Sequence, residues 1–159
     1  GAPRMGDAEA VRRLRQTVRL PMLRLELWHG FIFVNLDEDA PPLAPSAKLD
    51  TVAQLRVDDM VAEQYFAHDD PTDDPSRIDG KYFEVMQQLG IVGWHWAGEN
   101  LQLNNYADPF PVAMDRLMNS PTHRANILDP EYTHLGAAAQ INNRAVFVFA
   151  CIYTSGGAV

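Results

Sequence analysis

The last strand predicted in the chain, residues 144–153, constrains the fold more than any other feature. From Val146 onward every residue in it is apolar, so the strand presents Phe147, Phe149, Cys151 and Tyr153 on one face and Val146, Val148, Ala150 and Ile152 on the other. A strand with two apolar faces must be covered on both sides. We therefore predict an α+β fold, a three-layer α-β-α sandwich around a small antiparallel sheet.

The preceding residues, 135–141, are the predicted partner of this strand. The dipeptide Asn142-Asn143 lies between the two segments, and asparagine tolerates the positive φ that tight turns require. We therefore expect a hairpin that turns at this asparagine pair.

Apolar residues at helical spacing predict the helical layers. The expected helices cover residues 7–19, 46–64 and 78–89, a stretch from about residue 108, and a short turn that begins at Ser120-Pro121. Ser46 is a plausible N-cap, and Gly90 is the expected C-terminal stop. Residues 23–36 predict one or two strands, whereas residues 93–100 show no periodicity and are predicted to form a loop that walls a site.

Cysteine content and charge exclude several classes of protein. Cys151 is the only cysteine among 159 residues, so an internal disulfide and a thiolate metal cage are both impossible, and any metal must be held by histidine and carboxylate. The net charge of −8 argues against a nucleic-acid partner, because phosphate binding needs a basic patch. The basic cluster Arg12, Arg13, Arg15 and Arg19 fits one solvated helix face.

The chain also lacks the apolar segments that membranes and export machinery recognise. It has no run of about 18 apolar residues, so we expect no membrane span. Its first residues, Gly1-Ala2-Pro3-Arg4, are not a signal peptide, which leaves the compartment open.

Four histidines and one glutamate are candidates for chemistry, because each is expected in a loop or at the end of an element. They are His68, His95, His123, His134 and Glu99. Two imidazoles and a carboxylate can hold a divalent ion with a position left for water, and the same groups without metal can act as general base and acid. Sequence spacing alone does not distinguish a metal site from metal-free acid–base catalysis. The competing interpretation for each residue is a structural role, such as capping a helix end.

Four segments resemble bacterial CAP domains, the SCP/PR-1-like superfamily of cysteine-rich secretory proteins. In order they are Tyr65-Phe66-Ala67-His68, Gly98-Glu99-Asn100-Leu101, residues 118–128 with the specific His-Arg-Ala-Asn-Ile-Leu run, and residues 132–136. The resemblance spans residues 46–153 and implies the α-β-α sandwich with a central cleft. It also implies that the histidine and glutamate cluster of the cleft maps onto His68, Glu99 and His134.

From this resemblance we predict an extracellular or cell-surface domain whose cleft binds a divalent cation, with zinc as one candidate. His68 and His134 are the predicted metal ligands, and Glu99 with both histidines forms the predicted catalytic set for hydrolysis of peptide or ester bonds. The second cleft glutamate of eukaryotic members corresponds to Ser120 here, so a four-residue acid/base set is incomplete. His123 is the bacterial-type addition.

The alternative prediction is a module without catalytic activity that binds a small molecule, lipid or peptide, or a structural surface domain. The predicted ligand-binding residues are His123, Trp94, Trp96 and Asn100, with Tyr106 and Phe110 as further groove aromatics. Core packing is the competing interpretation for at least half of these aromatic residues.

We predict one CAP-like domain over residues 1–159, in which residues 24–45 exceed the usual link between the first two helices. This stretch resembles a strand segment of Rieske-type ring-hydroxylating oxygenases but has no cysteine ligands for a cluster. We therefore interpret it as an inserted strand pair without a redox role.

Overall fold

The computed structural model describes residues 24–28, 31–35, 43–69 and 80–156. The chain divides into two compact units, residues 1–40 and 41–159, and each is described by itself. The helix predicted over residues 7–19, with its arginine cluster, lies outside the described residues.

The first unit contains a strand pair. Strand β1 (Arg24–Trp28) pairs antiparallel with β2 (Phe31–Asn35), with Arg24 opposite Asn35 and Trp28 opposite Phe31. The strands expected within residues 23–36 are therefore confirmed.

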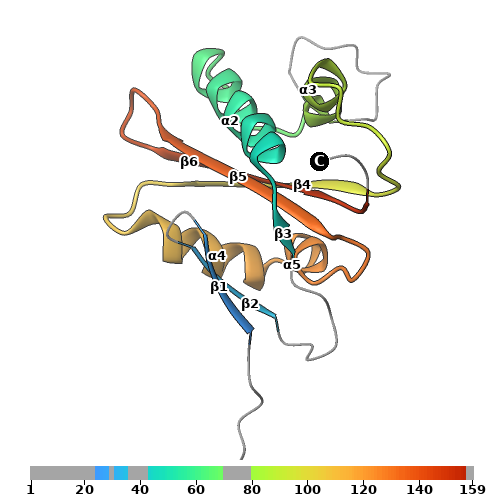
Figure 1. The fold of residues 1–159 in the computed structure, drawn as a ribbon. Coiled ribbons are helices and arrows are strands. Elements are labelled where there is room, and N and C mark those ends of the chain that lie inside the picture. The colour runs from blue at the N-terminus through green and yellow to red at the C-terminus, as the bar shows by residue number, and fades with distance from the viewer. Residues whose placement is uncertain (1–23, 29–30, 36–42, 70–79, 157–159) are drawn as a thin grey trace, which may run out of the picture. The chain divides into compact units, whose positions relative to one another are not determined.

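The second unit is built on a four-stranded sheet in the order β3-β5-β6-β4 (Figure 1). The strands are β3 (Ala44–Pro45), β4 (Ala97–Asn104), β5 (His134–Ile141) and β6 (Phe147–Thr154). Strand β3 runs parallel to β5, whereas β6 is antiparallel to both of its neighbours, so the sheet is mixed and not purely antiparallel as predicted. Residues 44–45, which we assigned to the inserted stretch, pair within this sheet.

Helices cover both faces of the sheet (Figure 1). Helices α2 (Ala47–Ala62) and α3 (Lys81–Gln88) lie on one side, and α4 (Pro109–Asn119) and α5 (Pro121–Ile127) lie on the other. All eight residues of β6 are buried, with Ile152 in the α2 core and Phe147 edge-on to Phe110 of α4 at 4.8 Å between ring centroids. The two apolar faces of this strand therefore have the two helical layers that they require, and the predicted sandwich is confirmed.

The predicted helix boundaries depend on two residues that the structure confirms. Ser46 caps α2, and its Oγ accepts the backbone N–H of Leu49 at 3.2 Å. Gly90 follows α3 with φ of 66°, the left-handed conformation that ends a helix. Among the described residues, no helix is long and apolar enough to cross a membrane.

The hairpin between β5 and β6 turns differently from the prediction. The residue with positive φ is Ala145, at 55°, and not the asparagine pair. Asn142 organises the loop through its side chain, because its Oδ1 accepts the backbone N–H groups of Arg144 and Val146. The hairpin is confirmed, whereas the expected asparagine conformation is wrong.

Strand β4 replaces part of the predicted loop. Residues 97–104 pair with β6 along their full length, from Ala97 opposite Thr154 to Asn104 opposite Phe147. The prediction of a loop over residues 93–100 therefore fails from Ala97 onward, and Glu99 projects from a strand. Pairing with the apolar strand β6 decides this structure, and that pairing is invisible in the local pattern.

Candidate functional site

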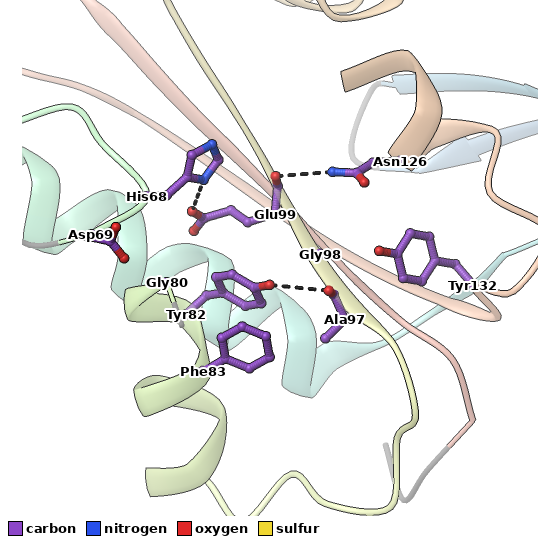
Figure 2. Close-up of a pocket in the computed structure, with 10 residues that line it drawn as sticks. All are labelled: His68, Asp69, Gly80, Tyr82, Phe83, Ala97, Gly98, Glu99, Asn126 and Tyr132. Carbon is purple, nitrogen blue, oxygen red and sulfur yellow. Dashed lines mark hydrogen bonds and ion pairs between the residues drawn. The ribbon is translucent and has the colours of Figure 1, made fainter. Parts of the chain in front are cut away.

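A pocket of about 320 Å³ opens at the free edge of the sheet, beside β4. Figure 2 shows its lining residues on both sides of this strand. His68, Tyr82 and Phe83 come from the side of α2 and α3, and Asn126 and Tyr132 come from the side of α5. Asp69, Gly80, Ala97, Gly98 and Glu99 complete the lining.

Glu99 is the central charged group of this pocket. Its side chain is fully buried, and its two oxygens accept separate hydrogen bonds, from Arg56 Nε at 2.9 Å and from His68 Nδ1 at 2.8 Å. A buried carboxylate is stable only when it is paired and hydrogen-bonded in this way. Both oxygens are therefore committed to protein partners.

Arg56 joins Glu99 to the segment that carries His68. This arginine of α2 is fully buried, and its Nη groups donate to Tyr65 Oη at 2.8 Å, to the Ala67 carbonyl at 2.9 Å and to the His68 carbonyl at 3.1 Å. Burial disfavours the charged guanidinium, but the charge of Glu99 and the bonds to it outweigh burial and raise the pKa of Arg56. One side chain thus fixes residues 65–68 relative to β4.

Tyr65 extends this network to α2. Its hydroxyl donates to the Asp59 carboxylate, and burial together with that bond raises the pKa of Tyr65 to about 12. The hydroxyl therefore stays protonated and keeps its donor role at neutral pH.

His68 is oriented with one ring nitrogen engaged and the other open. Because Glu99 accepts at Nδ1, that nitrogen carries the proton, and Nε2 is left available. The hydrogen bond to Glu99 raises the pKa of His68. The His68 side chain is 52% exposed, so its open edge is accessible from solvent.

His123 lies on α5 and is not among the residues that line the pocket, but it is close enough to His68 to be affected by its charge. Its Nδ1 lies 2.8 Å from Ser120 Oγ, and its pKa is lowered by burial and by the neighbouring charge of His68. The two imidazoles therefore interact electrostatically.

Two asparagines attach α5 to β4. Asn100 is fully buried, and its Nδ2 donates to the His123 carbonyl at 3.0 Å while its Oδ1 accepts from Asn126 at 2.9 Å. No described residue of α5 is buried, so these polar bonds contribute much of its attachment to the sheet. Asn100, predicted to bind a ligand, uses both polar atoms of its amide for the protein itself.

His134 lies elsewhere on the sheet. It begins β5, opposite Thr154 of β6, and Thr154 is in turn opposite Ala97, so β6 separates His134 from the pocket strand. Its Nδ1 is 2.8 Å from Thr133 Oγ1, and it is not among the residues that line the pocket. The structure thus joins Glu99 and His68 by a direct hydrogen bond, and His123 interacts electrostatically with His68. Neither His123 nor His134 is among the residues that line the pocket.

The predicted aromatic groove is not reproduced by the pocket. Trp94 packs on Phe83 with ring centroids 5.4 Å apart, and its Nε1 donates to the Ile91 carbonyl at 3.3 Å. Trp96 is 60% exposed, and neither tryptophan lines the pocket. Phe110 packs against Phe147, as the core interpretation of these aromatics expects.

Sequence reasoning missed three residues that build this site: Arg56, Asn126 and Tyr132. Arg56 carried a usable signal, since it falls on the apolar face of α2, between the buried residues Val57 and Ala53, where an arginine needs an acidic partner. Asn126 and Tyr132 lie within segments that resemble CAP domains, but they were not singled out as site residues, because their roles depend on long-range placement.

A metal can be held here only by an incomplete protein ligand set. Within the described ranges, no group of three or more histidine, cysteine, aspartate or glutamate residues is arranged to hold a metal ion. The histidines present allow a metal ion to be coordinated by two imidazoles, with water molecules as its other ligands.

Comparisons with known proteins agree on one family. A family model described as Cysteine-rich secretory protein family, abbreviated CAP, matches residues 37–153. Two Bacillus subtilis proteins, the uncharacterized protein YkwD and the uncharacterized membrane protein YlbC, are each 36% identical, over 95 and 90 residues. The matches cover 60% and 54% of this chain but 34% and 25% of those proteins, so this chain spans about a third or less of their length.

Solved structures show the same fold. An extracellular protein containing an SCP domain from Bacillus anthracis is 27% identical with a TM-score of 0.59, over 74% of this chain and 35% of that chain. An outer surface protein from Borrelia burgdorferi is 12% identical with a TM-score of 0.58, over 74% of this chain and 80% of that chain, and it supports the fold alone. The Rieske resemblance of residues 24–45 is not confirmed, since the CAP model covers residues 37–45 of that stretch.

Proposed function

This chain belongs to the CAP family, the cysteine-rich secretory protein family, and from that premise we propose that its pocket binds a divalent cation through the imidazoles of His68 and His123. The observation that carries the proposal is the His68–Glu99 pair. A carboxylate that holds the far ring nitrogen fixes the orientation of a ligand histidine and increases its basicity. The open Nε2 of His68 then faces the ion.

His123 is the better second ligand on electrostatic grounds. Burial and the charge of His68 lower its pKa, which favours the neutral imidazole that a metal requires. Its Nδ1 contact with Ser120 leaves Nε2 open. Neither His123 nor His134 is among the residues that line the pocket, and the preference for His123 rests on its electrostatic interaction with His68. His134, the second ligand inferred from the resemblance, has its Nδ1 next to Thr133 and serves as the matched comparison.

Glu99 has a positioning role in this proposal. Both of its oxygens are occupied by Arg56 and His68, so it orients His68 and does not act as a free general base. A bound divalent cation lowers the pKa of its water, which is the chemistry that hydrolysis of a peptide or ester bond needs. The histidines would hold the ion, and Arg56 would pair with the Glu99 carboxylate that orients His68.

The proposed place of action is outside the cell or at its surface. The support is the similarity to the Bacillus anthracis protein, which is described as extracellular. A single buried cysteine is compatible with that oxidising environment.

Zinc titration by calorimetry tests the proposal on four proteins: the unaltered chain, His68→Ala, His123→Ala and His134→Ala. We expect zinc binding to be lost in the first two variants and retained in His134→Ala. Undiminished binding in His68→Ala would overturn the site. Retention in His123→Ala with loss in His134→Ala would overturn the choice of ligands.

A further inference from the structure

The strand that carries Glu99 has one unpaired edge, and this edge forms the floor of the pocket. Within the described sheet, β4 pairs with β6 and has no strand on its other side. Ala97, Gly98 and Glu99 are the strand residues that line the pocket. The main chain of β4 is therefore accessible to a ligand at these positions.

The hydrogen-bond pattern shows which main-chain groups face this edge. The Ser155 N–H donates to the Trp96 carbonyl at 2.9 Å, so Trp96 directs its main-chain groups toward the C-terminal strand. Orientation alternates along an antiparallel strand, so Gly98 also faces β6 while Ala97 and Glu99 face outward. The outward direction has a second support, because the Ala97 carbonyl accepts from Tyr82 Oη at 3.2 Å and the Glu99 carbonyl accepts from Asn126 Nδ2 at 3.4 Å.

Glu99 therefore presents both a carbonyl and an N–H group to the pocket. Its carbonyl is held only by the long bond from Asn126, and no described residue supplies an acceptor for its N–H. One outward-facing residue with both groups available is the minimal unit for pairing with another extended main chain.

Tyr132 adds a second unmatched donor to the same pocket. The residue is 7% exposed, its ring stacks on Tyr153 at 5.4 Å, and its hydroxyl has no hydrogen-bond partner among the described residues. The hydroxyl lies directly over Gly98, where an added Cβ would come within 2.5 Å of it. Figure 2 shows this hydroxyl directed at the strand between Ala97 and Glu99.

We infer that this edge binds the main chain of an extended peptide, which pairs with the N–H and carbonyl of Glu99 and accepts a hydrogen bond from the Tyr132 hydroxyl. The ligand class follows from the groups that it must match, since a peptide unit supplies one acceptor and one donor at the spacing of a strand. A lipid chain offers neither group. The inference names the substrate class for the pocket of the proposed function, and it places a peptide carbonyl beside His68.

Amide hydrogen exchange on the full chain, followed by NMR, tests the pairing with the blocked tetrapeptide acetyl-tetraalanine-amide as probe. We expect the peptide to slow exchange of the Glu99 amide, with no change at Leu101, whose amide faces the same edge outside the pocket. The same peptide with N-methylated amides cannot donate to the Glu99 carbonyl and should protect the Glu99 amide more weakly at the same concentration. Unchanged exchange at Glu99 with millimolar peptide, or equal protection by the N-methylated peptide, would overturn the inference.

Tyr132→Phe separates the hydroxyl from the packing of the ring. Losing one hydrogen bond should weaken peptide binding roughly three- to ten-fold. Tyr106→Phe is the matched control, because that hydroxyl is bonded to Arg116 and lies outside the pocket. Equal affinities for the two variants would remove Tyr132 from the site.

The amide-exchange experiment with peptide and the zinc titration test the two proposals independently. Main-chain pairing needs no cation, so protection of Glu99 is expected in the presence of a chelator and in His68→Ala. Zinc binding without peptide protection would leave the cation site and overturn the peptide inference. Protection of Glu99 by peptide without zinc binding would leave the peptide inference and overturn the cation site.

Discussion

Arg56→Met is the substitution that most directly tests how the site is held together. Methionine has a similar length and can remain in the core, but it removes the charge that faces Glu99 and the donors to Tyr65, Ala67 and His68. Glu99 would then be a fully buried carboxylate with one remaining partner, the half-exposed His68.

The expected loss of stability follows from the burial of both partners. Removing one member of a buried ion pair costs about 3–5 kcal/mol, because the other charge is left uncompensated. In a domain whose total stability is about 5–15 kcal/mol, this is a large fraction. For a chain of this length the loss corresponds to a decrease in Tm of about 6–20 °C.

Urea unfolding followed by circular dichroism measures this loss. Arg144→Met, an exposed position in the β5–β6 loop, is the control and should change stability by less than about 0.5 kcal/mol. Glu99→Gln in the Arg56→Met background removes the stranded charge and should recover stability relative to Arg56→Met alone, with a coupling energy of at least about 1 kcal/mol. A loss below about 1 kcal/mol for Arg56→Met, or additive effects in the double variant, would refute the argument that the pair holds the site.

Three further predictions concern single positions. The hydrogen bond to Glu99 raises the pKa of His68. The stability that this bond contributes is therefore full below the unfolded-state histidine pKa of about 6.5 and is lost as the pH rises through the pKa of His68 in the folded protein. An NMR titration should show the raised pKa of His68 in the unaltered chain and a lower pKa of His68 in Glu99→Gln. Gly136→Ala places a Cβ in steric conflict with the backbone of Leu49 and should destabilise the fold by about 1–3 kcal/mol or more, measured by urea unfolding. A neutral result would contradict the close packing of α2 on β5. Burial raises the pKa of the Cys151 thiol to about 12, so a thiol reagent should modify it only after denaturation, and rapid labelling of the native protein would argue against its burial.

The layers of the fold were predictable because their cause lies in one segment. Two apolar faces on residues 147–153 require cover on both sides, and the helical spacing of the remaining segments supplies it. Strand β4 was not predicted because a buried strand is expected to be apolar. The buried residues of β4 include four polar ones, Glu99, Asn100, Gln102 and Asn104. Those polar groups are tolerated because they are hydrogen-bonded. Asn100 donates to the His123 carbonyl of α5, whereas Asn104 donates to the nearby Gln102 side chain and Pro109 carbonyl.

The candidate site was predictable only in part, because its residues come from elements that are distant in the sequence. Glu99 and His68 were identified as site residues, and the structure joins them by a hydrogen bond. Their spacing of 31 residues contains no information about Arg56, which links them from a third element. The choice between His123 and His134 likewise depends on tertiary placement, because His123 lies on helix α5 and His134 begins strand β5, and a sequence pattern does not encode how these elements are arranged around β4.

The position of β6 has a consequence for the order of assembly. Among the described elements it is the last strand, yet it lies between β4 and β5, which both pair with it and not with each other. During synthesis, neither of these earlier strands has its long antiparallel neighbour until residues 147–154 emerge from the ribosome. Cooperative closure of the sheet is therefore deferred until this segment has been made.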